Sequence, residues 1–254
     1  MDLLIDVGNS TIEWTSLDNG VLGSVGFSLH EGFKDPVGLF NSIWGGHLSP
    51  NRILVSNVAG EVFSTAFKSW VEGFCKCPVV FVKPQSKAFG VVNGYTEPEK
   101  LGIDRWLALV GARTRTQDAV IIVDVGTAIT VDALNKDGQH LGGVIAPGLN
   151  LMRTVLLERT SDIKLGEEDL AKQTDQSKCF ASDTSQAIVS GTNNAIAGMI
   201  NQTVSLFQAK METPILYLIT GGDAKRFLPM LANKYQYEPA LVLHGLAKVA
   251  GETR

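Results

Sequence analysis

The chain has 254 residues, of which 44% are hydrophobic and 19% charged, and its formal net charge at pH 7 is −4. This composition is typical of a globular protein with a full core, in one large domain or two of moderate size. Basic residues are scattered and no apolar run approaches membrane-spanning length, so we expect neither nucleic acid nor a membrane as a partner.

The start of the chain lacks the pattern of a signal peptide, and the three cysteines, an odd number, suit reduced thiols. We therefore expect a cytoplasmic protein. Cys75 and Cys77 have no second Cys or His pair nearby, so we expect no metal site there.

The first predicted element is a strand at residues 3–5, followed by a glycine loop and then by a second, β-branched strand. The loop has the sequence Asp6-Val7-Gly8-Asn9-Ser10-Thr11. Gly8 lets the backbone approach a ligand without a Cβ in the way, and the small hydroxyl residues beside it supply donors for phosphate oxygens. Because a strand rather than a helix follows, this is not the P-loop. The turn Asn19-Gly20 then predicts a hairpin.

Residues 53–60 predict a strand that ends in a turn of small residues. A helix at residues 61–72 should follow, because Phe63, Phe67 and Trp70 recur at helical spacing.

Residues 93–106 begin as a loop, since they contain Pro98 and several glycines, and continue as a helix from Asp104. Asp104 has two interpretations. It is either the helix N-cap, which accepts backbone N–H bonds, or a general base that accepts the proton of a substrate hydroxyl. Likewise, Arg105 is either a surface cation or a fork that binds an anionic substrate bidentately.

The strand and glycine-loop unit then occurs a second time. A predicted strand at residues 121–123 leads into Asp124-Val125-Gly126-Thr127-Ala128-Ile129-Thr130. Gly138, in the turn Asp137-Gly138, lies as far after Asp124 as Gly20 lies after Asp6. A single glycine loop between strands is usually only a turn, but equal spacing in two copies argues against chance.

Each glycine loop begins with a carboxylate. Asp6 and Asp124 would repel a bound phosphate unless a metal ion or a metal-bound water stood between them. The sequence therefore predicts a cation-bridged nucleotide.

Residues 165–178 are polar and charged, which favours a solvated helix and loop. Further on, residues 215–219 predict a buried strand, residues 220–223 a turn and residues 224–231 a helix. These three elements repeat the strand, turn and helix of the first half.

The repetition predicts an α/β protein made of two related domains, residues 1–117 and residues 118–254. Ligands of open α/β sheets bind where strand ends and loops converge. We therefore expect the two domains to face each other across a cleft onto which both glycine loops open.

Five motifs occur in order along nearly the whole chain. They are Asp6-x-Gly8-Asn9-Ser10, Gly94-Tyr95 before Leu101-Gly102-x-Asp104-Arg105, Asp124-x-Gly126-Thr127-Ala128-x-Thr130, Gly142-Gly143-x-Ile145-x-Pro147-Gly148, and Thr184-x4-Val189-x-Gly191. Together they closely resemble the motifs of type III pantothenate kinases. The resemblance implies a duplicated actin-like (ribonuclease H-like) fold, a homodimer, and ATP-dependent phosphorylation of pantothenate as the first step of coenzyme A synthesis. It also implies Mg²⁺ with ATP and a monovalent cation, K⁺ or NH₄⁺.

The resemblance further implies roles for single residues. Those that match the ATP site are Asp6, Val7, Gly8, Asn9, Ser10, Thr11, Ile12, Glu13 and Thr127. Those that match the pantothenate site are Tyr95, Gly102, Ile103, Asp104, Arg105 and Thr184. Among them Asp104 matches the proton acceptor, and Asp124 is similar to the ligand of the monovalent cation. Taken alone, Thr184 would be an ordinary helix cap.

One position departs from part of the family. Some members carry a lysine where this chain has Glu13, although other members also lack it. The change is weak evidence for a lower nucleotide affinity.

Two other functions stay open, a non-catalytic regulatory paralogue and a related kinase that acts on a sugar or acyl substrate. Asp104 and Asp124 disfavour the first, because a protein without catalysis has no need for buried, mutually repelling carboxylates. The motif Gly102-x-Asp104-Arg105 disfavours the second.

Overall fold

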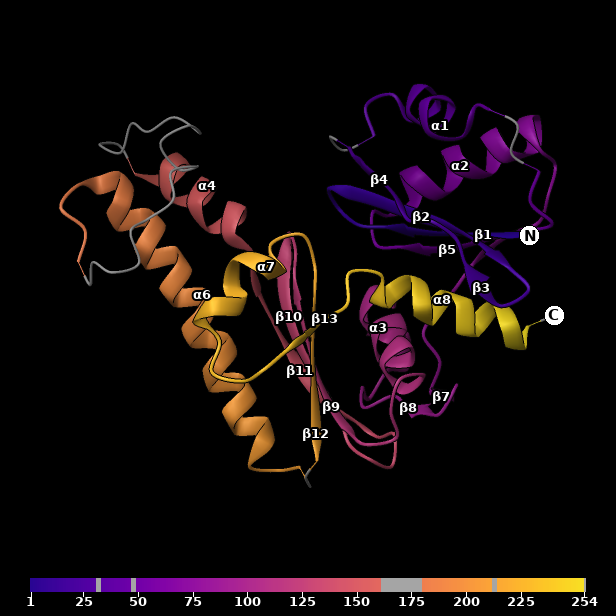
Figure 1. Cartoon of the computed structure of the whole chain (residues 1–254). Coiled ribbons are helices and arrows are strands. Elements are labelled where there is room, and N and C mark those ends of the chain that lie inside the picture. Colours follow the sequence, from indigo (N-terminus) through magenta and orange to yellow (C-terminus); the bar gives the residue numbers. More distant parts are fainter. Residues whose placement is uncertain (31–32, 47–48, 161–179, 212–213, 254) are drawn as a thin grey trace. The chain divides into compact units, whose positions relative to one another are not determined.

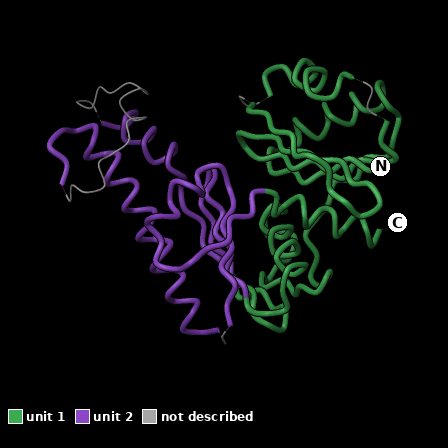
Figure 2. Tube along the Cα trace, viewed as in Figure 1, with its two compact units in different colours: residues 1–119, 134–142, 240–254 green, residues 120–133, 143–239 purple. Residues whose placement is uncertain are grey.

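The computed structural model describes residues 1–30, 33–46, 49–160, 180–211 and 214–253 (Figure 1). Its contacts group the chain into two compact units, which are coloured separately in Figure 2. Unit 1 comprises residues 1–119, 134–142 and 240–254, and unit 2 comprises residues 120–133 and 143–239.

Unit 1 is built on a mixed sheet in the order β3-β2-β1-β5-β6, with β4 paired to β2. The strands are β1 (Asp2–Val7), β2 (Thr11–Asp18), β3 (Val21–Leu22), β4 (Gly26–Leu29), β5 (Ile53–Asn57) and β6 (Val79–Phe81). The central strand β1 pairs antiparallel with β2 and parallel with β5. Its residues Leu3, Leu4, Ile5 and Val7 are all buried, as expected for a strand with both faces covered.

Helices cover both faces of this sheet. On one face, α1 (Pro36–Trp44) and α2 (Glu61–Phe74) bring Phe40, Phe63 and Phe67 against the side chains of β1 and β5. On the other face, α3 (Ile103–Arg113) and α8 (Leu241–Glu252) pack on each other and contact β5 and β1 (Figure 1). A short hairpin of β7 (Lys87–Ala88) and β8 (Val91–Val92) and the 3-10 turn η1 (Pro98–Lys100) precede α3.

Unit 2 is built on a sheet in the order β11-β10-β9-β12-β13. The strands are β9 (Ala119–Val125), β10 (Ala128–Leu134), β11 (His140–Pro147), β12 (Ile215–Thr220) and β13 (Gln236–Tyr237), and the helical elements are α4 (Leu149–Arg159), α6 (Thr184–Gln208), α7 (Ala224–Phe227) and η2 (Leu228–Met230). The long helix α6 buries Ile196, Ile200 and Val204 in the same core cluster as Val123 of β9. Hydrophobic burial of one helix stripe against the sheet therefore holds this unit together.

The two sheets have the same topology, which confirms the predicted duplicated α/β fold. In each sheet three consecutive strands lie side by side, β1-β2-β3 or β9-β10-β11, and two later strands extend the sheet beyond the first. The predicted hairpin turns are present, since Asn19, Gly20 and Gly138 have positive φ angles of 48°, 84° and 82°.

The contact units do not follow the predicted division at residues 117 and 118, because residues 134–142 and α8 group with unit 1. The predicted division separates the two copies of the duplicated unit, and it stays a prediction. The predicted cleft between the two domains also stays a prediction. Among the described residues, no helix is long and apolar enough to cross a membrane.

Most predicted elements are present with small changes in length. The predicted helix 61–72 is α2, and the predicted strand 215–219 is β12. The helix predicted at residues 224–231 is wrong in length, since α7 ends at Phe227 and a 3-10 turn that contains Pro229 follows. Proline has no N–H to continue an α-helix, which explains the change. The segment 165–178 lies outside the described residues.

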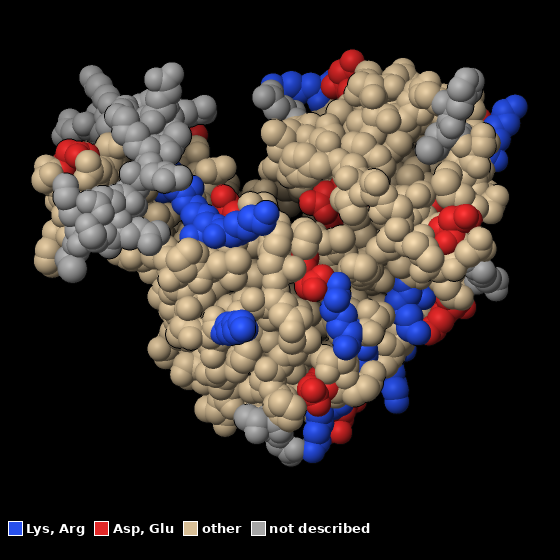
Figure 3. Space-filling model, viewed as in Figure 1, with Lys and Arg blue, Asp and Glu red and all other residues tan. Residues whose placement is uncertain are grey.

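On the face shown in Figure 3, basic and acidic side chains are interspersed. Among the described residues on this face, the mixture of charges gives no extended positive field of the kind that binds a nucleic-acid backbone.

Candidate functional site

The first glycine loop is the turn of the β1–β2 hairpin. Val7 pairs with Ile12 and Asp6 pairs with Glu13 across the two strands, and the Gly8 N–H donates to the Thr11 carbonyl at 2.9 Å. Val7 and Ile12 are fully buried, whereas Asn9 at the tip is exposed. The predicted ATP segment is thus one continuous hairpin, in which Asn9 at the tip faces solvent and the flanking apolar residues anchor the loop in the core.

His30 also contacts this loop, although the sequence gave no sign of it. Its ring nitrogen Nε2 lies 2.9 Å from the Gly8 carbonyl oxygen, and its backbone N–H donates to the Ser10 carbonyl at 3.0 Å. His30 follows the last residue of β4, so only the pairing of β4 with β2 brings it to the loop.

Glu13 is half-buried in β2, opposite Asp6 on β1 and Phe27 on β4. Burial raises the pKa of the Glu13 carboxyl, because removal from water disfavours the charged form.

A second group of predicted residues is assembled around Arg105, which is only 5% exposed. Its Nη1 donates to the Tyr95 hydroxyl at 2.6 Å, and the guanidinium lies over the tyrosine ring at 5.5 Å. The ring of His140, the first residue of β11, stacks on Tyr95 from 6.1 Å at an interplanar angle of 12°. His140 is a residue that the sequence did not indicate, because it follows a hairpin turn far from Tyr95 in the chain.

Asp104 lies beside this group, at the N-terminus of α3. The interpretation of Asp104 as the N-cap is wrong, since Gly102 is the N-cap and Asp104 is the second helical residue. Its Oδ1 nevertheless accepts the Arg105 N–H at 2.8 Å. The side chain therefore satisfies one of the unpaired N–H groups of the first helical turn while its carboxylate stays half-buried.

In unit 2 three loops meet at the end of β9. The Gly148 N–H donates to the Thr127 carbonyl at 2.9 Å, and the Asp223 N–H donates to the Val125 carbonyl at 3.0 Å. Gly221 has a φ of +94°, and a Cβ there would lie 2.5 Å from both Asp124 Oδ1 and the Val125 carbonyl oxygen. The second glycine loop is therefore held by the segments that follow β11 and β12.

Within this group Asp124 is half-buried and Thr127 is exposed. No cluster of three or more His, Cys, Asp or Glu residues with the arrangement of a metal site occurs among the described residues. The role of Asp124 as a cation ligand stays a prediction.

Thr184 is the exposed first residue of α6. The helix cap is Asp183, whose side chain accepts the Gln186 N–H at 2.8 Å, so the interpretation of Thr184 as a cap is wrong by one residue. The predicted site residues are thus divided, with Tyr95 and residues 102–105 in unit 1 and Thr184 in unit 2.

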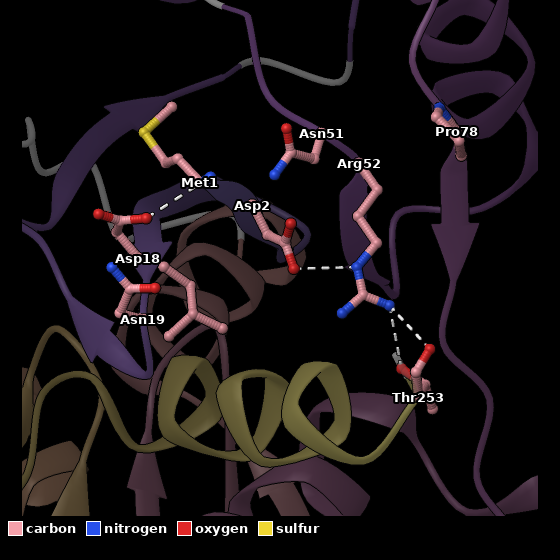
Figure 4. Close-up of a pocket in the computed structure, with 9 residues that line it drawn as sticks. Met1, Asp2, Asp18, Asn19, Asn51, Arg52, Pro78 and Thr253 are labelled. Carbon is pink, nitrogen blue, oxygen red and sulfur yellow. Dashed lines mark hydrogen bonds and ion pairs between the residues drawn. The ribbon is translucent and has the colours of Figure 1, made fainter.

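A cavity of about 480 Å³ in unit 1 lies at the start of β1 and contains none of the predicted site residues (Figure 4). Arg52 donates there to Asp2 at 2.9 Å and to the Ala250 carbonyl at 2.6 Å. These contacts tie the end of α8 to β1, which makes Arg52 a structural residue.

The repeated topology and the glycine loop after the first strand of each sheet define an actin-like α/β fold. The fold of the A component of (R)-2-hydroxyglutaryl-CoA dehydratase from Acidaminococcus fermentans is similar, with a TM-score of 0.55 and 14% identity over 98% of this chain and 95% of that one. The family model for type III pantothenate kinase matches residues 2–206.

Two curated relatives, both called type III pantothenate kinase, extend the match to the full length. The chain is 38% identical to the one from Nitrosococcus oceani, over 100% of this chain and 95% of the relative. It is 33% identical to the one from Halorhodospira halophila, over 97% and 96% respectively. The chain belongs to the type III pantothenate kinase family.

Proposed function

We infer that the protein transfers the γ-phosphoryl group of ATP to a hydroxyl of pantothenate, giving ADP and 4′-phosphopantothenate, the first step of coenzyme A synthesis. The observation that carries this inference is the family match over residues 2–206, together with relatives that align over nearly their whole length. We expect the reaction in the cytoplasm, where the thiols of Cys75 and Cys77 would stay free.

We assign the ATP phosphates to the loop between Asp6 and Glu13, with Thr127 as a further contact. Support comes from the tip of the β1–β2 hairpin, where Asn9 is exposed between Gly8 and Ser10, both of them half-buried. Magnesium bound to the phosphates would neutralise the charge that otherwise repels the Asp6 carboxylate.

We assign the pantothenate carboxylate to Arg105 and Tyr95. A buried guanidinium is a strong attractor for a carboxylate, because little water remains to screen it. The Tyr95 hydroxyl accepts a hydrogen bond from Arg105 at 2.6 Å and so holds the guanidinium in place. The ring of His140 stacks on the ring of Tyr95. Gly102, Ile103 and Thr184 complete this assignment on the strength of the motif match.

We assign the general base to Asp104. Phosphoryl transfer requires chiefly positioning and charge neutralisation, and a carboxylate near the acceptor takes the proton of the attacking hydroxyl. The hydrogen bond from the Arg105 N–H orients the Asp104 carboxylate, which would take the substrate proton.

We assign a monovalent cation, K⁺ or NH₄⁺, to Asp124. A carboxylate at the end of β9 beside the Val125 carbonyl provides oxygen donors of the kind that suits such a cation. The bound cation would supply positive charge near the phosphates.

We also propose a homodimer. Beyond residue 142, strand β11 and helix α4 expose five large apolar side chains, namely Val144, Ile145, Leu151, Val155 and Leu156. Exposed apolar side chains mark a protein–protein interface where they form one contiguous patch. The mass of the purified protein in solution, measured by light scattering, should be twice that of one chain.

The reaction is tested with purified protein, ATP, magnesium and potassium, and with pantothenate, acetate or a panel of sugars as the acceptor. Phosphopantothenate should form, and ADP release should depend on pantothenate. Protein that is folded but releases ADP only with a sugar or acetate, or with none of the acceptors, would refute the assignment.

A further inference from the structure

His30 binds the first glycine loop on both sides of its tip. The Nε2 of its ring contacts the Gly8 carbonyl at 2.9 Å, and its own N–H donates to the Ser10 carbonyl at 3.0 Å. Because a carbonyl oxygen only accepts, the ring hydrogen must be on Nε2. His30, which lies outside the loop, therefore holds the carbonyls of Gly8 and Ser10, the two neighbours of Asn9 in the chain.

The ring of His30 is itself held in place by the core. It stacks on Phe33 at 3.9 Å with an interplanar angle of 23°, and Phe33 contacts Phe63 of α2 at 5.0 Å. Phe33 is buried and has a φ of +56°, a left-handed conformation that is unusual and strained for a bulky residue. The surrounding packing thus keeps a strained residue in the position where it supports the imidazole.

The orientation of the Gly8 carbonyl decides where the next N–H points. In a planar trans peptide the C=O and the following N–H point in opposite directions. With the Gly8 carbonyl turned towards His30, the Asn9 N–H is turned away from it, at the exposed tip of the hairpin. Glycine alone would not keep this orientation, because it populates many backbone conformations.

We propose that His30 is a positioning residue, which fixes the Gly8–Asn9 peptide so that the Asn9 N–H faces a phosphate oxygen of ATP. This inference rests on the proposed ATP site. Backbone N–H groups aimed at one point bind phosphate well, and they do so best when their orientation is set before the nucleotide arrives.

The test compares His30→Leu, which has no donor, with His30→Gln, whose side-chain amide N–H can reach the same carbonyl. His30→Leu should raise the KM for ATP and the Kd for ADP by about 3- to 10-fold, the worth of one hydrogen bond. The KM for pantothenate should not change, and His30→Gln should restore most of the nucleotide affinity. Equal Kd values for ADP in all three proteins would overturn the inference.

Two further observations separate this inference from the proposed function. A wild-type protein that makes no phosphopantothenate refutes the function, whereas an active wild type with an unaffected His30→Leu refutes only the role of His30. If His30→Leu does not fold, the inference is tested with the wild-type protein, through the amide signal of Asn9 in its nuclear magnetic resonance spectrum. It should move downfield when ADP is added, and an unmoved signal would contradict the inference.

An independent feature of unit 1 is the pair of thiols after α2. Cys75 and Cys77 are free, and their sulfur atoms lie 3.1 Å apart. The residue between them, Lys76, has a φ of +51°, a turn that accompanies the approach of the two side chains. Both cysteines pack against the core cluster of α1 and α2, so the pair is held by the fold.

We propose that Cys75 and Cys77 form a reversible disulfide when the protein meets hydrogen peroxide. The Cys75 sulfur takes one oxygen atom from the peroxide, giving a sulfenic acid and one water. The Cys77 sulfur then attacks the Cys75 sulfur, loses its proton and releases the second water. Two electrons pass from the sulfurs to the peroxide, and a dithiol reductant reverses the step.

Burial and the neighbouring Cys75 raise the pKa of the Cys77 thiol. We assign the first reaction with peroxide to Cys75 and the closure of the bond to Cys77, whose sulfur already lies 3.1 Å away.

Trypsin gives a direct readout, because it cleaves after Lys76, between the two cysteines. Folded protein is treated with hydrogen peroxide, denatured, alkylated and digested without reduction. The peptides 69–76 and 77–87 should remain joined, should separate after dithiothreitol, and should be separate in Cys75→Ser. Alkylation of both cysteines after peroxide, a sulfinic acid at Cys75, or a bond from either cysteine to Cys179 would overturn the proposal.

Discussion

The buried guanidinium of Arg105 donates a 2.6 Å hydrogen bond to the Tyr95 hydroxyl and lies over the face of the same ring. A planar guanidinium held in this way has a fixed orientation, unlike the flexible ammonium of a lysine. In the proposed site, this pair would give the pantothenate carboxylate a binding group whose orientation is already set.

Arg105→Lys should raise the KM for pantothenate and leave the KM for ATP nearly unchanged, because the charge remains and the fork is lost. Tyr95→Phe should act in the same direction but less strongly, since it removes only the acceptor that orients Arg105. Steady-state kinetics with each substrate varied in turn measures both effects. An effect confined to the KM for ATP would contradict the assignment.

Asp104→Asn should lower the turnover number by roughly 100- to 10,000-fold, the usual size of general base catalysis. The melting temperature should change little, because the Asn side-chain oxygen can still accept the Arg105 N–H. Glu99→Gln, an exposed carboxylate on η1, is the matched control and should keep normal turnover. Normal turnover in Asp104→Asn would rule out the catalytic role.

Activity should rise steeply when sodium is replaced by potassium or ammonium at constant ionic strength. If Asp124 holds the cation, Asp124→Asn should lose this response, because the neutral amide binds a cation far more weakly than a carboxylate. Initial rates in the three salts measure the effect. Equal rates of the wild-type protein in all three salts would exclude the cation.

Glu13→Gln should make the protein more stable at pH 7 and have little effect near pH 4. The pKa of Glu13 is raised in the folded state, so the unfolded state releases the proton first as the pH rises. The contribution of protonated Glu13 to stability is therefore fully present below the pKa that Glu13 has in the unfolded chain. It is lost as the pH rises through the pKa that Glu13 has in the folded protein. Urea unfolding at several pH values tests this, with Glu72→Gln as an exposed control in the same unit. A constant difference between Glu13→Gln and the wild type at all pH values would show that burial of the charge is not the cause.

Gly221→Ala should destabilise the protein by roughly 1 to 3 kcal/mol, because alanine is strained at positive φ. The added Cβ would also approach Asp124 and the Val125 carbonyl. Gly222→Ala is the control, since a Cβ at Gly222 meets nothing within 4 Å. Thermal unfolding of both variants measures the difference, and equal melting temperatures would refute this account of Gly221.

The sequence by itself determined the duplicated α/β fold and the position of both glycine loops. These features are local, because a buried strand, a glycine turn and a hairpin turn each depend on residues close together in the chain. Helix ends were predicted less well, since Gly102 and Asp183, rather than Asp104 and Thr184, are the caps. Neighbouring residues compete for the cap, and the path of the preceding loop decides between them.

Only the tertiary structure decided which residues lie beside those of the proposed site. His30 reaches Gly8 because β4 pairs with β2, and His140 reaches Tyr95 because the start of β11 lies beside the loop before α3. The raised pKa of Glu13 has the same origin, since burial is set by the elements that surround a residue and not by its neighbours in the chain. Local patterns specify strands and turns, but contacts between distant segments exist only once those elements have packed.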